Sequence, residues 1–204
     1  MEKAIGFYWT LPVPWAGFNK LSTQVDDAAA QSRTIRYQRD LIRRHAKTNS
    51  LELVHEAVFL EIFPDRGSET VSEALKTISA LAGVNQAIVL LVDFSAAQNW
   101  RSHQSLQNHA RHFGLTLEMV YPEEVIIDGK PFDPASHFED WRQRQADWSA
   151  GKPARLANAL ARAKLLRATG ASFSTTAATL NAEGLPSPTG KLWTADNLRK
   201  ALVT

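Results

Sequence analysis

The sequence predicts an α/β protein with three layers and a mostly parallel sheet, followed by a small all-helical domain. Residues 1–127 alternate between short apolar runs and polar, helix-prone segments, the order of elements that a parallel sheet requires. The run "QAIVLLVDF" (86–94) is almost continuously apolar and ends in an acid, as is typical of a central strand buried on both faces. From Asp133 onward the patterns are helical.

The apolar runs predict strands over 3–9, 51–62, 86–94 and 115–122, and a strand with a turn at the sheet edge over 123–132. Helices are expected between them over 26–47, over 68–83 and ending over 105–114. The helix over 68–83 opens on a capping-box-like Ser68 and Glu69 after a turn at 64–68, and it stops at Gly83.

The change of pattern after residue 132 predicts three parts: an α/β domain over 1–132, a linker helix over 133–153 and a helical domain over 154–204. Within the linker helix Phe138, Trp141, Gln145 and Trp148 follow one side, and such a stripe packs either on its own sheet or on a partner subunit. The stretch "SAGKP" (149–153) is expected to link this helix to three shorter ones over 154–170, 174–184 and 194–203.

Composition narrows the class of protein. The chain has no cysteine, which excludes disulfides and thiolate metal sites and agrees with a reducing compartment. No apolar stretch approaches the ~20 residues that a membrane span needs. We expect a cytoplasmic protein without membrane contact, cofactor or metal.

Positive charge is concentrated at the C-terminal end. Residues 151–204 carry eight Lys and Arg against two acids, a balance of +6 in a chain whose net charge is only +2. The order helix, short turn, short helix, loop and helix is that of a helix-turn-helix unit. Ser174 and Thr194 are expected to cap the second and third helices, with Ala177, Ala178 and Leu180 forming the second helix's apolar face. Double-stranded DNA is the predicted partner, bound through Lys152, Arg155, Lys191, Thr194, Asn197, Arg199 and Lys200.

The same stretch, "TTAATLNAEGLPSPTGKLWTADNLRKAL", resembles the segment that follows the catalytic domain in serine recombinases, the resolvases and invertases. The positions that match are Ala178, Leu180, Asn181, Gly184, Leu185, Ser187, Pro188, Gly190, Trp193, Leu198 and Leu202. The N-terminal region is similar to that family more weakly: the segment 34–38 matches a family helix motif that ends in Gln38, and "VLLVDF" matches a family strand that ends in Asp93. The resemblance implies a resolvase-like α/β domain, action on DNA, and pairing as a homodimer or with a partner recombinase.

Serine recombinases attack a DNA phosphate with a serine hydroxyl while arginines neutralise the charge that develops. Two registers place these residues here. If 3–9 is the first strand, Trp9 stands for an arginine and Leu11 for the serine; if "GFNKLST" (17–23) fills the motif, Ser22 is the nucleophile and Lys20 replaces the arginine. We prefer the first register, because Pro14 and Gly17 make the second a poor strand.

The arginines expected after the third strand are also missing. Phe94 and Ala97 stand in their places, and only Arg66 and Arg101 lie near in sequence. Loss of one charge-stabilising donor typically costs about 2.7–4 kcal/mol of transition-state stabilisation. We therefore expect a DNA-binding or regulatory protein whose cleavage centre is degraded. Two alternatives stay open: an active recombinase that uses Ser22, with Gln38 and Asp93 in its site, and an α/β domain that senses a small ligand at the strand ends and switches the helix-turn-helix.

Overall fold

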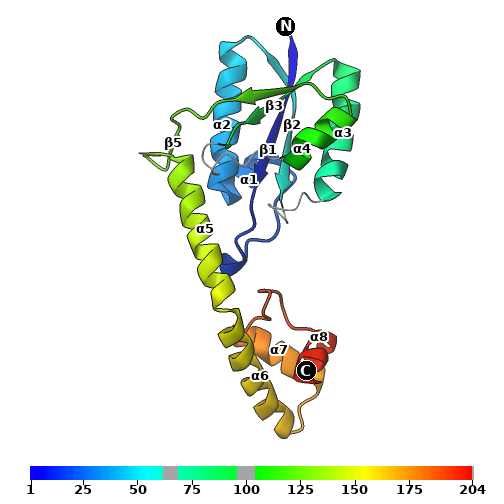
Figure 1. The fold of residues 1–204 in the computed structure, drawn as a ribbon, viewed down its shortest axis with the longest axis vertical. Coiled ribbons are helices and arrows are strands. Elements are labelled where there is room, and N and C mark those ends of the chain that lie inside the picture. The colour runs from blue at the N-terminus through cyan, green and yellow to red at the C-terminus, as the bar shows by residue number, and fades with distance from the viewer. Residues whose placement is uncertain (62–68, 96–103, 204) are drawn as a thin grey trace. The chain divides into compact units, whose positions relative to one another are not determined.

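The structure, a computed structural model, describes residues 1–61, 69–95 and 104–203 (Figure 1). The chain divides into two compact units. Unit 1 consists of Met1–Pro12 and Phe18–Trp141, and unit 2 of Val13–Gly17 and Arg142–Thr204. The turn expected at 64–68 and the capping residue Ser68 lie outside the described residues.

A four-stranded parallel sheet forms the centre of unit 1. Its strands are β1 (Lys3–Thr10), β2 (Glu52–Leu60), β3 (Ile88–Val92) and β4 (Leu117–Val120), in the order β2-β1-β3-β4. The predicted α/β class and parallel sheet are thus confirmed. Because β1 and β3 are the inner strands, their side chains are the most deeply buried, and every residue of β1 after Lys3 is buried.

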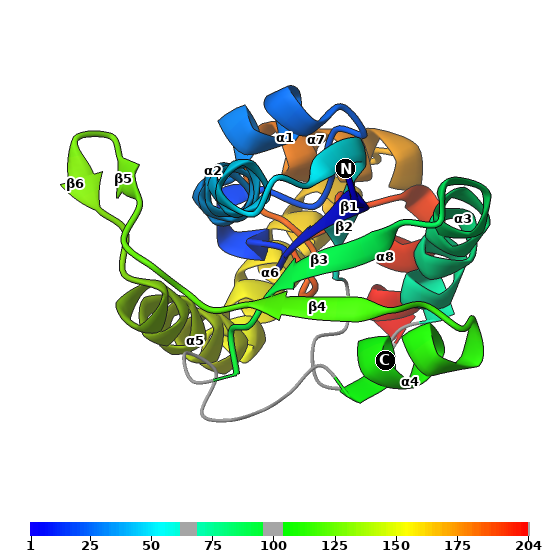
Figure 2. The ribbon, with the colours of Figure 1, turned by 90° about the horizontal axis from the view of Figure 1, so that it is seen from above.

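Helices cover both faces of this sheet. In Figure 2, α1 (Val25–Gln31) and α2 (Arg33–Thr48) lie on one face, while α3 (Glu69–Asn85) and α4 (Gln104–His112) lie on the other. The single helix predicted over 26–47 is wrong in one respect, because Ser32 adopts an extended conformation and separates α1 from α2. Its hydroxyl accepts a hydrogen bond from the Ile35 amide and donates one to Thr10 Oγ1 at 3.1 Å, so the break also anchors α2 to the end of β1.

The segment 123–132 does not join the sheet edge as predicted. It forms a separate antiparallel hairpin of β5 (Ile126–Ile127) and β6 (Lys130–Pro131), turned by Asp128 and Gly129, both with positive φ. Pro131 lacks an amide donor for a longer ladder. Arg36 of α2 holds the turn through an ion pair with Asp128, 2.7 Å between Nη1 and Oδ1.

Unit 2 is helical. It contains the second half of α5 (Pro134–Ala150), then α6 (Lys152–Ala168), α7 (Phe173–Ala182) and α8 (Ala195–Val203), together with the short 3-10 helix η1 (Pro14–Ala16). The linker expected over 149–153 is reduced to Gly151, which alone separates α5 from α6. None of the helices in the described residues is both long and apolar enough to cross a membrane.

A close contact in β1 gives the first prediction. Tyr8 lies back over Gly6, so a Cβ at residue 6 would stand 2.5 Å from the Tyr8 hydroxyl, which Glu56 holds at 2.6 Å. We expect Gly6→Ala to lower the free energy of unfolding by about 1–3 kcal/mol, since the buried tyrosine has no room to move. Urea unfolding followed by tryptophan fluorescence measures the change.

The matched control is Gly83→Ala in α3, where a Cβ meets no atom within 4 Å. There the same substitution should raise stability by about 0.5–1 kcal/mol, because alanine favours a helix over glycine. Equal effects of the two substitutions would contradict the proposed clash.

Candidate functional site

The first strand ends where the first register places it. β1 closes at Thr10, and Leu11 follows with only 6% of its surface exposed. A buried leucine therefore occupies the position at which the family resemblance puts a nucleophile. In a doubly wound sheet this is also where ligands bind, since the strand order reverses between β1 and β3.

Aromatic side chains occupy the carboxyl ends of β1 and β3. The ring of Trp9 meets that of Phe94 edge-on at 5.8 Å between centroids, and Phe138 of α5 stacks on Trp9 at 6.1 Å and meets Phe94 at 5.2 Å. Tyr37 and Phe132 extend this group, which we call the strand-end aromatic cluster. Trp9 and Phe94 stand where the resemblance implies arginines, and each is buried. Ala97 lies outside the described residues.

Gln38 acts on the backbone of β1. Its Nε2 donates to the carbonyl of Trp9 at 2.6 Å and to that of Thr34 at 3.0 Å, and its Oε1 accepts from the Trp9 amide at 3.1 Å. The side chain is fully buried and prolongs the ladder of β1 in place of a neighbouring strand. Asp93, the other predicted site residue in this region, accepts a hydrogen bond from the Ser95 amide at 2.8 Å and shapes the turn after β3.

Ser22 lies in the loop between β1 and α1, away from any strand. Its Oγ accepts a hydrogen bond from the Gln24 amide at 3.1 Å, and its amide donates to Gln31 Oε1 at 2.9 Å. The first turn of the following helix carries Asp26 and Asp27. Asp26 is paired with arginines of α2, and the charge of Asp27 opposes an incoming phosphate. Arg66 and Arg101 lie outside the described residues.

The arginines of α2 are all paired with carboxylates of unit 1. The pairs are Arg33 and Arg36 with Asp128, Arg39 with Asp26 and Asp40, Arg43 with Glu56 and Asp26, and Arg44 with Glu123. Both Arg43–Glu56 hydrogen bonds measure 2.9 Å, and this bonding raises the pKa of Arg43. Burial, with Glu56 second, raises the pKa of Tyr8. A phosphate would therefore have to displace carboxylates to reach these guanidinium groups.

In unit 2 the three helices α6, α7 and α8 surround a small apolar core. Its buried members are Ala159, Ala163, Ala177, Leu180, Trp193 and Leu198. The prediction that Ala178 belongs to the apolar face of α7 is wrong, because this residue is exposed. Thr176 is buried in its place, because its hydroxyl donates to the Ser172 carbonyl at 2.8 Å and so needs no water.

The caps of α7 and α8 agree with the sequence prediction only in part. Ser172, not Ser174, caps α7, and its Oγ accepts from the Thr175 amide at 3.0 Å. Thr194 does cap α8: its Oγ1 accepts from the Asn197 amide at 3.2 Å, while Asn197 Oδ1 accepts from the Thr194 amide at 2.8 Å. The Asn197 side chain, predicted to meet DNA, is thus engaged at the start of its own helix.

The loop between α7 and α8 is closed by residues of the recombinase-like pattern. Asn181 pairs with the backbone of Trp193 in both directions, accepting from its amide at 2.8 Å and donating to its carbonyl at 3.0 Å. The Trp193 indole donates to the Leu185 carbonyl at 2.8 Å. Gly184 and Gly190 supply positive φ at the two turns. These matched residues determine the path of the loop and hence the start of α8.

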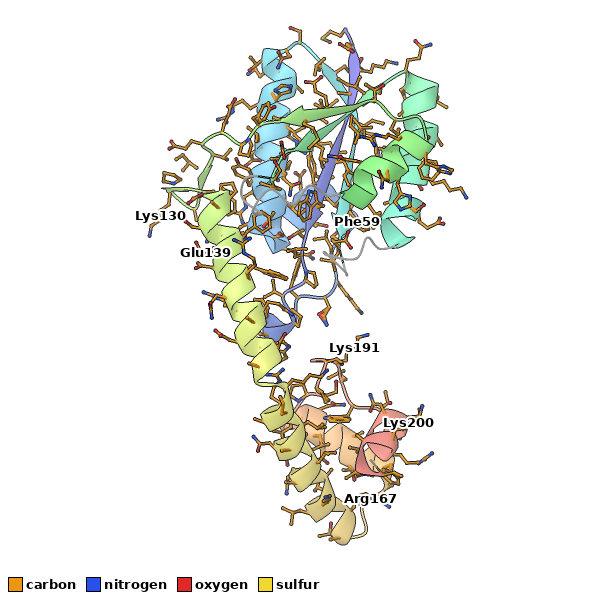
Figure 3. The ribbon with its side chains drawn as sticks, viewed as in Figure 1. Phe59, Lys130, Glu139, Arg167, Lys191 and Lys200 are labelled. Atoms are coloured by element: carbon orange, nitrogen blue, oxygen red, sulfur yellow. The ribbon has the colours of Figure 1, made fainter. Side chains whose placement is uncertain are left out.

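The basic residues of unit 2 come from several elements. Residues 142–204 carry ten Lys and Arg against three Asp and Glu, a balance of +7. Lys152 begins α6, Lys191 lies on the α7–α8 loop, and Arg199 and Lys200 lie on α8, all of them exposed. Figure 3 shows Lys191 and Lys200 on their elements. Lys200 pairs with Asp196 at 2.9 Å on the surface of α8.

Arg155 differs from the other predicted DNA contacts. Its guanidinium lies 3.5 Å from the centre of the Trp148 ring and donates to the Trp148 carbonyl at 2.6 Å. This arginine therefore joins the end of α5 to the start of α6. Trp148, one of the aromatic stripe, is used in the same contact, while Phe138 is buried in the core of unit 1 and Trp141 donates to the Pro12 carbonyl at 3.0 Å.

No family model, curated protein or solved structure matches the chain. Among the described residues no group of three or more His, Asp or Glu side chains is arranged to hold a metal ion. The function must therefore be inferred from the residues and geometry described above.

The Asn181–Trp193 pairing gives the second prediction. Asn181→Ala removes the side-chain partners of both the amide and the carbonyl of Trp193. We expect faster hydrogen exchange at the Trp193 amide and a free energy of unfolding lower by about 1–3 kcal/mol. Hydrogen exchange of the full chain measures the first effect. Asn158→Ala, at an exposed position of α6, is the control and should leave exchange at Trp193 unchanged.

Proposed function

We propose that the chain is a DNA-binding protein of the serine-recombinase type that does not cleave DNA. Unit 2 binds the duplex and places α8 in the major groove. Unit 1 acts as a regulatory or assembly domain. The observation that carries the proposal is the contrast between the units: the α2 arginines of unit 1 are paired with carboxylates, whereas unit 2 has an excess of seven positive charges.

The geometry of unit 2 supports binding to a duplex. Thr194 fixes the start of α8, and Arg199 and Lys200 are exposed on that helix. A short helix of this kind enters the major groove, and lysine and arginine side chains around it meet phosphates. Within the closed α7–α8 loop, the Ser187 amide donates to the Lys191 carbonyl at 3.0 Å and so fixes the backbone that carries Lys191.

The strand-end aromatic cluster supports the absence of cleavage. A phosphoryl transition state needs donors that stabilise its growing negative charge. Trp9 and Phe94 occupy the positions where the resemblance implies arginines, and they pack against each other and against Phe138. The same packing opposes the ligand-sensing alternative, since aromatic side chains occupy the carboxyl ends of β1 and β3, where ligands bind in such sheets.

Pairing with a second copy or with a partner recombinase remains part of the proposal. The aromatic stripe of α5 contributes nothing to it, because Phe138, Trp141 and Trp148 each have partners within their own unit. A partner recombinase that supplies the cleavage chemistry would explain why a chain with this centre keeps a DNA-binding unit.

DNA binding is tested with a duplex that the wild-type protein selects from a randomised library. Arg199→Ala and Lys200→Ala should each weaken binding roughly fivefold and reduce the slope of log K against log salt by about 0.9 for each phosphate that the variant no longer neutralises. Fluorescence anisotropy at several KCl concentrations measures both. Lys76→Ala, which removes an exposed charge of α3 in unit 1, is the control; equal losses in all three variants would refute the assignment to unit 2.

The absence of cleavage is tested on a supercoiled plasmid that carries the selected duplex. We expect no covalent protein–DNA adduct after denaturing electrophoresis, and the same result for Ser22→Ala, because Ser22 lies in a loop where its hydroxyl is bonded to the Gln24 amide. An adduct that forms with the wild type and disappears in Ser22→Ala would establish the active-recombinase alternative.

A further inference from the structure

Two arginines of unit 2 share one aromatic ring. The guanidinium carbon of Arg167, at the end of α6, lies 4.1 Å from the centre of the Phe173 ring, and that of Arg199, on α8, lies 5.3 Å from it. Phe173 begins α7 and is partly buried against the core of the unit. One side chain of α7 thus gathers a cation from each of the other two helices.

The ring holds these charges without neutralising them. Both distances lie within the ~6 Å over which an aromatic face attracts a guanidinium. Within the part of the chain that the structure describes, neither Arg167 nor Arg199 forms an ion pair, in contrast to Arg43, which Glu56 binds through two hydrogen bonds. Asp196 is the acid closest to Arg199 in the sequence. The hydrogen bond and charge of Lys200, and to a smaller extent the charge of Arg199, hold the pKa of Asp196 below its usual value.

Of the two arginines, Arg167 is also restrained by a backbone hydrogen bond just beyond its helix. Arg167 donates to the Ala171 carbonyl in the turn before α7, which fixes one edge of its guanidinium. Arg199 lies on the exposed side of α8. Because both side chains reach one ring, their charged groups are separated by less than the two ring distances combined, a span over which one DNA strand presents neighbouring phosphates.

We propose that Phe173 is a positioning residue for DNA binding: its ring holds the guanidinium groups of Arg167 and Arg199 ready to contact neighbouring phosphates of one strand. This inference rests on the proposed function. An aromatic ring suits the role because it orders flexible side chains before binding, so that less conformational freedom is lost on the duplex. A carboxylate at residue 173 would order them equally well but would cancel the charge that the phosphates recognise.

The test is a double-mutant cycle between residues 173 and 199, measured with the selected duplex by fluorescence anisotropy over a range of KCl concentrations. Phe173→Leu keeps an apolar side chain against the core but removes the aromatic face. We expect it to weaken binding roughly threefold to fivefold, and Arg199→Ala to cost much less in the Phe173→Leu background than in the wild type. Phe173→Tyr, which restores the face, should restore both affinity and coupling.

The outcomes separate the inference from the proposed function. If the wild type binds and Arg199→Ala weakens binding, but the two substitutions are additive, Phe173 is only a packing residue and the inference is overturned while DNA binding stands. If the wild type binds no duplex, the proposed function fails and the inference fails with it. Thermal melting of each variant shows whether it is folded.

If Phe173→Leu does not fold, Arg199→Lys takes its place. Lysine keeps the charge but lacks the planar group that lies over an aromatic face. A clear loss of affinity in Arg199→Lys supports the inference, and wild-type affinity overturns it.

Discussion

The partners of the arginines decide where this chain can meet an anion. A guanidinium group keeps its charge at any pH of interest, so what differs between sites is whether a carboxylate neutralises it. In unit 1 the arginines of α2 face Asp26, Glu56, Glu123 and Asp128, which also tie α2 to β2 and to the β5–β6 hairpin. In unit 2 Arg162 is paired with Glu183, whereas the guanidinium groups of Arg155, Arg167 and Arg199 lie over aromatic rings. The first arrangement ties the elements of unit 1 together, and the second leaves Arg167 and Arg199 without a carboxylate partner among the described residues.

The cost of holding cations without partners also bears on the strand-end aromatic cluster. A centre built to hold a phosphate must keep several cations close together in a partly dry pocket, which is costly unless each has a partner. Trp9, Phe94 and Phe138 remove that cost by packing together, and Gln38 completes the hydrogen bonds of β1 beside them. The described carboxyl ends of β1 and β3 thereby become part of the core of unit 1.

The elements that the sequence predicted well are those with a strong local signal. The four parallel strands lie within two residues of their expected bounds because each is a short apolar run between polar segments. The caps Ser32 and Ser172 were missed because the backbone conformation, and not the residue type, decides which serine caps a helix. Ser174 lies two residues after Ser172 and has the same hydroxyl, so the sequence alone does not separate the two. Of the candidate DNA contacts, Arg199 and Lys200 are exposed on α8, as expected for that helix. Arg155 instead contacts Trp148 across the break at Gly151, and Asn197 is bonded to Thr194 at the start of its own helix.

The recombinase-like pattern is best understood as a pattern of loop geometry. Asn181, Gly184 and Trp193 close the path from α7 to α8 through backbone hydrogen bonds and positive φ, and none of these tasks involves a ligand. Such residues can match between two chains that bind different DNA sites, because they fix the start of α8 and leave its exposed side chains to vary. Sequence similarity confined to this pattern therefore indicates a similar path of the α7–α8 loop and a similar start of α8. Under the proposed function, the choice of DNA site would rest on exposed residues such as Arg199 and Lys200, which the pattern does not constrain.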